Sequence, residues 1–317
     1  MYTDIFYGNT FANAYKVALW SLVYAPEYKA APKGKNINEI LNATLCIANP
    51  LECIISNPIR GTPLNYLKGE LVWYLAGRND LEFIQHFSKF WKKIANPDLT
   101  CNSAYGNLLF TKDVNNMPRW KWALDSLIND PFSRQAILHF NLPKHCYAEN
   151  KDVVCTMYGN FHIRDNKLHF SVNMRSNDIK RGTIFDVPFF CFLQYIMLKQ
   201  LQFASKDEKS ALNNVLQGKQ LQLGEFVLKA DSFHLYEPDI EEACEMLANK
   251  DWQSKTLVVP NAYDNPDETL PITMQGLSQP FMQKLADDML RSKNTNMPLI
   301  DIAYCPNDAF YSWLAEG

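Results

Sequence analysis

Leucines recur at helical spacing within residues 63–77, which predicts an amphipathic helix there. The leucines of this stripe are Leu64, Leu67, Leu71 and Leu75. Gly77 suits the end of such a helix, because glycine readily adopts the left-handed conformation that closes many helices. Glu70 lies one residue from the stripe, at the edge of the buried face, and periodicity alone favours a solvated carboxylate there.

A strict alternation of apolar and polar residues over 167–175 predicts a β-strand. Its apolar face consists of Leu168, Phe170, Val172 and Met174. Residues 153–163 are also strand-like, and Asp165 and Asn166 between the two segments are typical turn residues. The two segments form a predicted β-hairpin, with Cys155 on the earlier strand.

Three further segments are predicted to be helical, at residues 187–203, 239–248 and 279–291. The first is apolar but interrupted by glutamines and a lysine, so we interpret it as a buried helix that is short for a membrane span. Strands and helices mix without a regular rhythm, which predicts an α+β fold, or loosely α/β, with a sheet covered by helices. We expect a single domain over 1–317, with a C-terminal extension of uncertain role from about residue 256.

Composition excludes few functions but narrows the class of partner. Of the 317 residues, 47% are hydrophobic, which is ample for a core, and a net charge of −3 argues against a basic face for nucleic acid. No secretion signal is recognisable at the start, and the eight cysteines are scattered without a C-x-x-C pair. We therefore expect a cytoplasmic protein with reduced thiols, no zinc or other metal site, and no membrane partner.

Several short motifs then follow one another in a recognisable order. Cys155 is followed by Arg175-Ser176-Asn177-Asp178, by Gly182 and Phe185-Asp186, by Gly224-Glu225-Phe226 and by His234-Leu235-Tyr236. Upstream lie E-L-V-W-Y-L-A-G at Glu70–Gly77, Ala104-Tyr105-Gly106 and Asp130-Pro131-Phe132-Ser133-Arg134. In order and spacing, over about residues 33 to 240, this set resembles the thymidylate synthase family. The resemblance implies that family's fold, a large mixed sheet covered by helices with one sheet face used for dimerisation.

The resemblance implies a chemistry that these residue types can perform. A thiolate that adds to carbon 6 of a pyrimidine makes carbon 5 nucleophilic, so that carbon 5 can attack the one-carbon unit of 5,10-methylenetetrahydrofolate. Cys155 would be the thiolate, and Arg175 would favour its charged form and bind the nucleotide phosphate. Taken alone, Cys155 reads equally as a small buried apolar residue, and Cys146 fails as nucleophile on its spacing to Arg175.

The other site residues are implied by the same resemblance. Phosphate ligands would be Ser176, Arg60, Lys33 and, donated by the partner subunit of a homodimer, Arg134. His234 and Tyr236 would hold the 3′-hydroxyl of the sugar, and Asp178, Gly182 and Trp91 would form the folate site. Glu70 would organise water and assist proton transfer at carbon 5. Without the resemblance, each charged residue reads as a surface charge.

The residue after Phe185 bears on the choice of base. Thymidylate synthases have asparagine there, which offers an acceptor to N3–H of uracil and a donor to O4. Asp186, when protonated, offers a donor to N3 of cytosine and an acceptor to its amine. This resembles the phage deoxycytidylate hydroxymethylases of the superfamily and points to dCMP. Two alternatives stay open: a neutral carboxyl that turns over to serve uracil, and a bond from Asp186 to a nearby backbone group.

Departures from the family pattern bear on the product. Thr156 and Ile184 stand where the family has histidine and proline, and residues 311–317 do not match the segment that closes its site. Because methyl formation needs a closed, dry site, these departures favour water addition and a hydroxymethyl product. Gln135 stands where the family has a second arginine after Arg134, which concerns the phosphate site. Trp91 lies one residue off the alignment with a tryptophan that assists reduction, and it keeps methyl transfer open.

Several functions therefore remain as hypotheses. The first is a dCMP 5-hydroxymethylase, found in the host cytoplasm if a phage encodes it. The second is a dUMP-directed thymidylate synthase or hydroxymethylase, or a dCMP 5-methyltransferase. The third is an inactive relative that binds nucleotide or RNA, against which the joint presence of Cys155, Glu70 and Arg175 argues. A fourth, coincidental motifs in an unrelated protein, conflicts with the order and spacing of the motifs.

Overall fold

The computed structural model describes residues 4–112, 115–260, 272–273, 276–277, 279–295, 310 and 313–314. The chain forms two compact units. The first consists of Met1–Thr62, Cys155–Leu198 and Lys219–Leu257, and the second of Pro63–Val154, Lys199–Gly218 and Val258–Gly317. The single domain expected over the whole chain stays a prediction.

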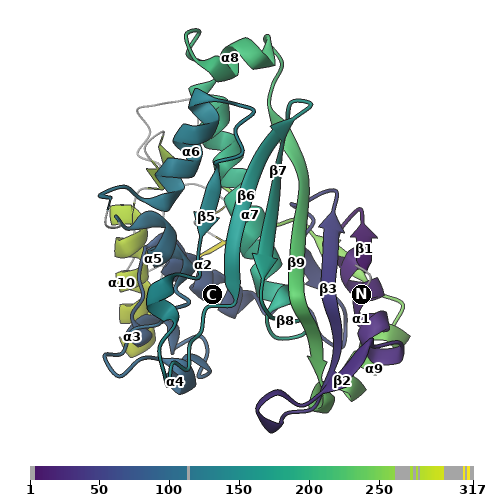
Figure 1. Ribbon diagram of the computed structural model, residues 1–317. Helices are drawn as coiled ribbons and strands as arrows, with labels where there is room; N and C mark the ends of the chain where they lie inside the picture. The colour runs from purple at the N-terminus through teal and green to yellow at the C-terminus, as the bar shows by residue number, and fades with distance from the viewer. Residues whose placement is uncertain are drawn as a thin grey trace. The chain divides into compact units, whose positions relative to one another are not determined.

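A mixed β-sheet is the centre of the first unit (Figure 1). Its strands are β1 (Ile5–Gly8), β2 (Tyr28–Ala30), β3 (Ile37–Ile47), β6 (Thr156–Arg164), β7 (Lys167–Met174), β8 (Asn177–Asp178) and β9 (Gln222–Tyr236). The order is β1-β3-β9-β7-β6, with β2 beside β3 and β8 beside β9. Strand β9 runs antiparallel to β3 and parallel to β7 and β8, which is the mixed arrangement expected for the family. Strands β4 (Ile54–Ser56) and β10 (Gln253–Lys255) form a separate antiparallel pair.

Strands β6 and β7 form the predicted hairpin. The apolar face of β7 is buried as the alternation predicts, and the rings of Phe161 and Phe170 stack across the pair at 4.0 Å. Thr156 pairs with Met174 and Tyr158 with Asn173, so Met157 is an extra residue, a β-bulge. One detail of the prediction was wrong, because Cys155 lies directly before β6 and not on it.

Helices pack on this sheet. They are α1 (Phe11–Tyr24) and the first part of α7 (Thr183–Ala204), while α9 (Ile240–Ala248) packs against α1. The short 3₁₀ turn η1 (Pro32–Gly34) lies between β2 and β3, and η3 (Glu237–Asp239) lies between β9 and α9. Helix α7 lies behind β6 and β7 in Figure 1, and the ring of Phe190 meets Phe170 of β7 at 6.3 Å. These helices on a mixed sheet confirm the predicted α+β class.

Helix α7 has 22 residues, so the expectation that this segment is short for a membrane span was wrong. Among the described residues, it alone is long and apolar enough to cross a membrane. However, 83% of its most apolar window is buried in the protein, as in the core helix of a folded unit. Gln194 in this helix donates its amide to the backbone oxygen of Leu168 in β7, which ties the helix to the sheet.

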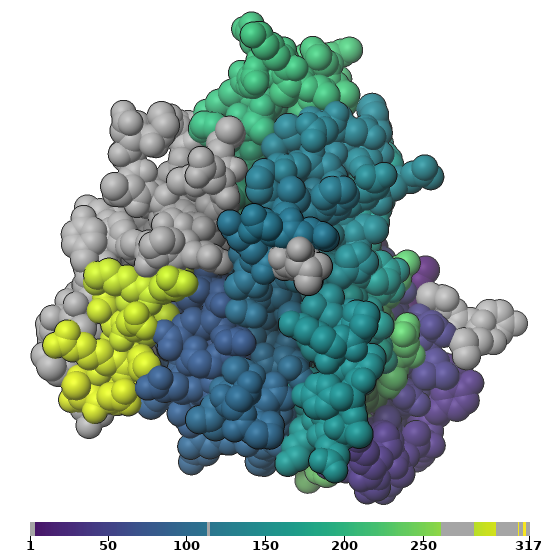
Figure 2. Space-filling model, turned by 60° about the vertical axis from the view of Figure 1, so that its left-hand side comes forward, coloured from purple at the N-terminus to yellow at the C-terminus, as the bar shows by residue number. Residues whose placement is uncertain are grey.

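The second unit is mainly helical. Its helices are α2 (Leu64–Leu75), α3 (Leu81–Ile84), α4 (Trp91–Ile94), α5 (Tyr105–Phe110), α6 (Arg119–Asn129), the end of α7, α8 (Ala211–Leu216) and α10 (Gln279–Thr295). Strands β5 (Ile137–His139), β11 (Ile272–Thr273) and β12 (Gly276–Leu277) and the turn η2 (Pro143–His145) complete it. The helices predicted at 63–77 and 279–291 are confirmed, and they pack together as α2 and α10 (Figures 1 and 2).

Gly106, which follows Tyr105, allows two helices of the second unit to pack closely. A Cβ atom at position 106 would lie 1.7 Å from the backbone oxygen of Tyr74, so only glycine lets α5 approach α2 this closely. The approach stacks the rings of Tyr74 and Tyr105 at 5.4 Å between centroids. This packing fixes the face of α2 that carries Glu70.

Candidate active site

Cys155 and Arg175 face each other at the open end of the β6–β7 hairpin. Cys155 is half-buried directly before β6, and Arg175 follows β7. The Arg175 N–H donates to the Cys155 carbonyl at 2.9 Å, and its guanidinium Nη2 lies 3.4 Å from Sγ of Cys155. A guanidinium beside a sulfur stabilises the thiolate, which is the nucleophilic form. The hairpin formed by β6 and β7 connects the two residues in the sequence, and the pairing of its strands brings them together.

Strands β8 and β9 bring three further predicted residues to this end of the sheet. Asp178 pairs with His234 across the strands, and the rings of His234 and Tyr236 meet edge to face at 5.2 Å. Burial raises the pKa of the Tyr236 hydroxyl, and the Asp178 carboxylate and the Cys155 sulfur add to the rise while Arg181 opposes it. The strand pairing and the ring contact thus place Asp178, His234 and Tyr236 in one cluster.

Asp178 also organises the loop that follows it. Its Oδ1 accepts from the backbone N–H of Lys180 at 2.8 Å and of Arg181 at 3.0 Å. Burial raises the pKa of Asp178, and these backbone bonds act in the opposite direction. The loop leads directly to Gly182 and to the start of α7. The Asp178 carboxylate therefore helps to fix the conformation of the segment that precedes these site residues.

Asp186 lies in the first turn of α7 beside Asn177 and Gly182. The amide Nδ2 of Asn177 donates to Oδ2 of Asp186 at 2.8 Å. A Cβ atom on Gly182 would lie 3.2 Å from the same Oδ2, so the glycine gives this carboxyl its room. The sequence analysis did not identify this side-chain amide as a neighbour of Asp186, and the bond to a backbone group that it left open stays a prediction.

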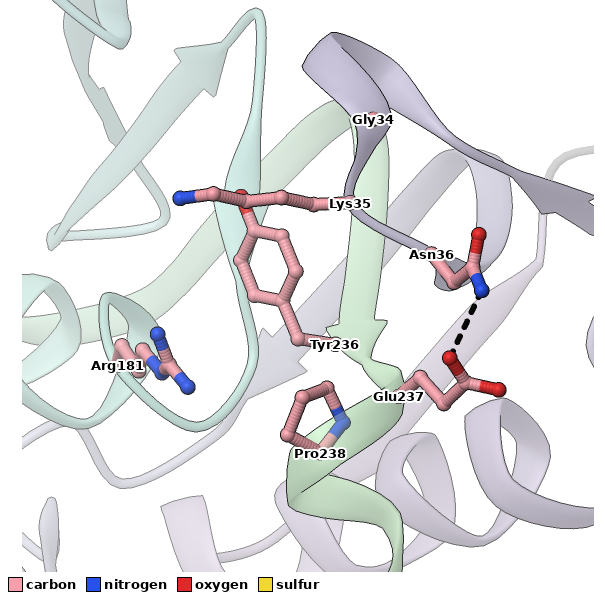
Figure 3. A pocket seen from close by; sticks show the side chains of 7 residues that line it. All are labelled: Gly34, Lys35, Asn36, Arg181, Tyr236, Glu237 and Pro238. Atoms are coloured by element: carbon pink, nitrogen blue, oxygen red, sulfur yellow. Dashed lines mark hydrogen bonds between the residues drawn. The ribbon is translucent and has the colours of Figure 1, made fainter.

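A pocket of about 380 Å³ lies beside Tyr236 (Figure 3). It is lined by Gly34, Lys35, Asn36, Arg181, Tyr236, Glu237 and Pro238. Nζ of Lys35 lies 5.9 Å and the guanidinium of Arg181 5.2 Å from the centre of the Tyr236 ring, so two cations flank the tyrosine. Lys33 does not line this pocket; it is exposed in η1 with a φ of 52°.

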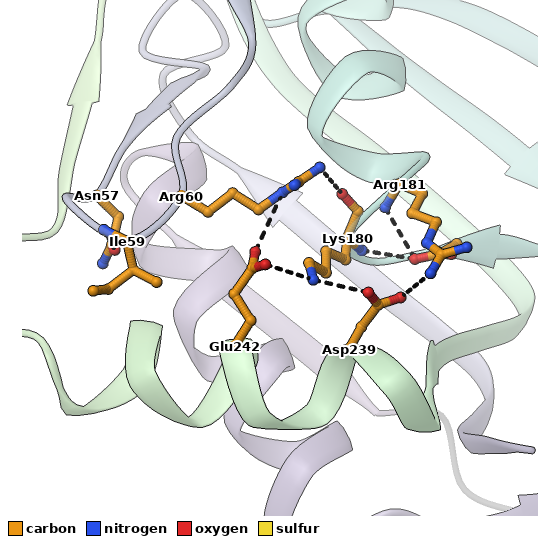
Figure 4. A network of polar contacts seen from close by, with 8 residues as sticks. Asn57, Ile59, Arg60, Lys180, Arg181, Asp239 and Glu242 are labelled. Atoms are coloured by element: carbon orange, nitrogen blue, oxygen red, sulfur yellow. Dashed lines mark hydrogen bonds and ion pairs between the residues drawn. The ribbon is translucent and has the colours of Figure 1, made fainter. Parts of the chain in front are cut away.

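Arg60 belongs to a network of charges whose other members lie on the loop before α7, in η3 and on α9 (Figure 4). The buried Lys180 contacts Asp239 at 2.8 Å and Glu242 at 3.0 Å, and Arg181 contacts Asp239 at 2.6 Å. Arg60 lies 3.8 Å from Glu242 and 3.5 Å from the carbonyl oxygen of Lys180. The carboxylate of Glu242 is thus the acidic group nearest to Arg60 in this network, and the role of Arg60 as a phosphate ligand stays a prediction.

Glu70 of the second unit is buried, so its interpretation as a solvated carboxylate was wrong. Only 7% of the residue is exposed, and its Oε1 accepts from the hydroxyls of Tyr66 at 2.7 Å and Tyr74 at 3.1 Å. The Tyr66 hydroxyl in turn accepts from the indole Nε1 of Trp91 at 3.0 Å. Burial raises the pKa of Glu70 to about 7, against the lowering effect of the two tyrosines. A carboxyl with this pKa can both accept and donate a proton near neutrality.

We expect Glu70→Gln to stabilise the protein above neutral pH. Because the folded-state pKa of Glu70 lies near 7 and its ordinary value is 4.5, ionisation costs folding free energy as pH rises between these values. Glutamine carries no charge and keeps an acceptor for both tyrosines, so at pH 8 the variant should gain on the order of 3 kcal/mol. Urea unfolding at pH 8 and pH 4 measures this, and an equal difference at both values would contradict it.

Arg134 of the second unit is exposed in the loop after α6, beside the exposed Phe132. Asp130 shapes this loop by accepting from the backbone N–H of Phe132 at 3.0 Å. Cys146 is an exposed thiol of the same unit, and the seven cysteines in the described part of the chain carry thiols rather than disulfides. Within that part, no three His, Cys, Asp or Glu side chains gather closely enough to hold a metal ion.

Several known proteins are similar in sequence to this chain. The profile of the family described as thymidylate synthase matches residues 58–272. A deoxyuridylate hydroxymethyltransferase of Bacillus phage SP01 is 31% identical over 173 residues, which are 48% of this chain and 43% of that protein. A deoxycytidylate 5-hydroxymethyltransferase of Enterobacteria phage T4 is 28% identical over 176 residues, 54% of this chain and 66% of that one. The matches thus span less than two thirds of either relative.

A solved structure shares the fold. The thermostable thymidylate synthase A from Bacillus subtilis superposes with a TM-score of 0.58 at 17% sequence identity, over 84% of this chain and 93% of that one. At this identity the likeness concerns the fold alone. The profile match ends at residue 272, beyond the limit near 240 that the motifs indicate.

Proposed function

The chain belongs to the thymidylate synthase family, and we propose that it transfers a one-carbon unit from 5,10-methylenetetrahydrofolate to carbon 5 of dCMP, with water addition giving 5-hydroxymethyl-dCMP. The contact of the Arg175 guanidinium with the Cys155 sulfur carries the proposal for the transfer, because it favours the nucleophile that this chemistry needs. Asp186, at the position of the family's asparagine, carries the proposal for the base.

The proposed reaction forms and breaks its bonds in a fixed order. The thiolate of Cys155 adds to carbon 6, and carbon 5 then bonds to the methylene carbon of the folate, which breaks its bond to one of its two nitrogens. Loss of the carbon 5 proton and cleavage of the bond to the second nitrogen release tetrahydrofolate and leave an exocyclic methylene group. Water adds to that group, and elimination of Cys155 restores the ring. Glu70, with a pKa of about 7, is the proposed carrier of protons and organiser of water.

The remaining residues are proposed to bind and orient the two substrates. His234 and Tyr236 would hold the sugar hydroxyl, and Asp178, Gly182 and Trp91 the folate. Arg175, Ser176, Arg60 and Lys33 would bind the phosphate, together with Arg134 from the partner of a homodimer. We add Lys35 and Arg181 as candidate anion ligands, because both flank Tyr236 in the pocket. The proposed setting is the cytoplasm of a cell or of an infected host.

A dUMP-directed reaction is the second candidate. One of the relatives is described as a deoxyuridylate hydroxymethyltransferase, and a neutral Asp186 whose proton changes oxygen can serve uracil. Methyl transfer to either base is the alternative in which hydride from tetrahydrofolate replaces water. Base and product are separate questions, and each has its own measurement.

Release of tritium from carbon 5 tests the base. With methylenetetrahydrofolate present, we expect faster release from dCMP than from dUMP by about tenfold or more, because a wrong base leaves polar groups unpaired. Without the folate, release should stop with both nucleotides. Preference for dUMP would overturn the assignment of the base. Dihydrofolate formation, followed by absorbance, tests the product, since methyl transfer generates dihydrofolate and hydroxymethylation does not.

A further inference from the structure

The amide of Asn177 is held at both ends beside Asp186. Asn177 is 3% exposed, and its Oδ1 contacts the hydroxyl of the fully buried Thr183. Its Nδ2 donates to Oδ2 of Asp186 at 2.8 Å and lies 3.0 Å from the sulfur of Met174. A thioether sulfur has no hydrogen and can only accept, so the end of the amide that faces Met174 and Asp186 is the donor end.

This orientation determines what Asp186 presents to a base. Because Asn177 offers only a donor to Oδ2, that oxygen must accept, and a proton carried by Asp186 resides on the other oxygen, Oδ1. Turning the carboxyl by half a rotation exchanges the two atoms, yet the oxygen nearest to Asn177 still has to accept. The order of donor and acceptor in space therefore stays the same.

We propose that Asn177 is a positioning residue that fixes the donor and acceptor order of Asp186 and thereby sets the discrimination between cytosine and uracil. The inference rests on the proposed function, in which Asp186 reads the base. A neutral carboxyl by itself serves either base, since its proton moves freely between two equivalent oxygens. Asn177 makes these oxygens inequivalent. The disfavoured base would then place its own donor against the donor of Asp186 and its own acceptor against the acceptor.

The surroundings of the pair support a fixed arrangement. A Cβ atom on Gly182 would lie 3.2 Å from Oδ2 of Asp186 and 3.5 Å from Nδ2 of Asn177, so backbone covers this side of the contact. Asn177 is held in β8, where it pairs with Phe233 of β9. The hydroxyl of Thr183 also lies 3.1 Å from the carbonyl oxygen of Asp178, so it retains an acceptor when the side chain at 177 changes.

The test compares Asn177→Leu with the wild-type protein, using kcat/KM for dCMP and for dUMP from tritium release. Leucine has the same branched arrangement of side-chain heavy atoms as asparagine, with a larger volume, and it cannot donate. The side chain at position 177 then no longer fixes which oxygen of Asp186 carries the proton. We expect kcat/KM for the disfavoured nucleotide to rise about tenfold, while that for the favoured one changes less than about threefold. A fall of both constants by one common factor would mean a structural role only and would overturn the inference.

Thr183 supplies a matched pair of variants. Thr183→Val removes the hydroxyl that anchors Oδ1 of Asn177 and should lower the ratio of the two constants in the same direction, by a few-fold. Thr183→Ser retains the hydroxyl and should keep the wild-type ratio. Equal ratios in the valine and serine variants would count against an anchored amide.

The outcomes separate this inference from the proposed function. A wild-type preference for dUMP defeats the assignment of the base, yet the change of ratio in Asn177→Leu still tests the inference. If neither nucleotide releases tritium, the proposed function fails. Dissociation constants of dCMP and dUMP, measured by calorimetry, then provide the ratio, and an unchanged ratio in Asn177→Leu overturns the inference.

Discussion

Cys155→Ala is expected to lower turnover by a factor on the order of 10⁴ or more, because removing a covalent nucleophile leaves no path to an activated carbon 5. Nucleotide binding should persist within a few-fold, since Arg175, His234 and Tyr236 remain. Tritium release measures turnover, and calorimetry with dCMP measures binding. The half-buried position of Cys155 directly before β6 makes the change small for folding, which a thermal melt checks.

Cys146→Ala is the matched control for this experiment. Cys146 is an exposed thiol of the second unit, and its loss should leave turnover unchanged. Retained turnover in Cys155→Ala, or an equal loss in both variants, would remove Cys155 from the role of nucleophile. Loss of nucleotide binding together with turnover would instead assign Cys155 to the binding of the substrate.

Asp186→Ala is expected to abolish the discrimination between bases. A site built to hydrogen-bond a base loses on the order of 10²–10⁴ in kcat/KM when the partner is removed. The constant for dCMP should fall by such a factor, and the constants for dCMP and dUMP should then agree within a few-fold. Competition between the two nucleotides in one tritium-release assay measures both values.

Asp231→Ala is the control for this aspartate. Asp231 is exposed on β9 of the same unit, so its removal changes the net charge equally without touching the β8–α7 loop. A discrimination that survives in Asp186→Ala would show that other groups read the base. The inference about Asn177 would then fall as well, because it acts through Asp186.

Local periodicity predicted the elements that carry the site. The alternation over 167–175 and the turn at Asp165 and Asn166 identify the β6–β7 hairpin, since one face of each strand is buried. The motifs place Cys155 and Arg175 at its open end, and the structure confirms their contact. The prediction succeeded because the two strands of a hairpin are close in the sequence. The position of the turn and the lengths of the strands then determine which residues lie opposite each other.

Burial by distant elements could not be predicted in the same way. The leucine stripe of α2 marks one face, but the helix is buried at every residue from Leu67 to Leu75. Glu70 is therefore enclosed, and its partners Tyr66 and Tyr74 follow from helical spacing only once that enclosure is known. Lys180 is a similar case, because a lysine in a loop normally indicates solvent and here it is buried against Asp239 of another segment.

Because of the β-bulge at Met157, single-codon deletions at different positions of β6 should disturb the structure to different extents. Loss of the Met157 codon would leave a regular ladder, with Thr156 opposite Met174 and Tyr158 opposite Asn173, and Cys155 still next in line to Arg175. Loss of the Asn160 codon would carry Tyr158 to the inner face in place of Gly159, where a Cβ atom alone already lies 2.7 Å from the Phe170 ring. Among descendants of this gene, single-residue deletions in β6 should therefore occur mainly at Met157. A deletion there keeps the Cys155 thiol beside the Arg175 guanidinium.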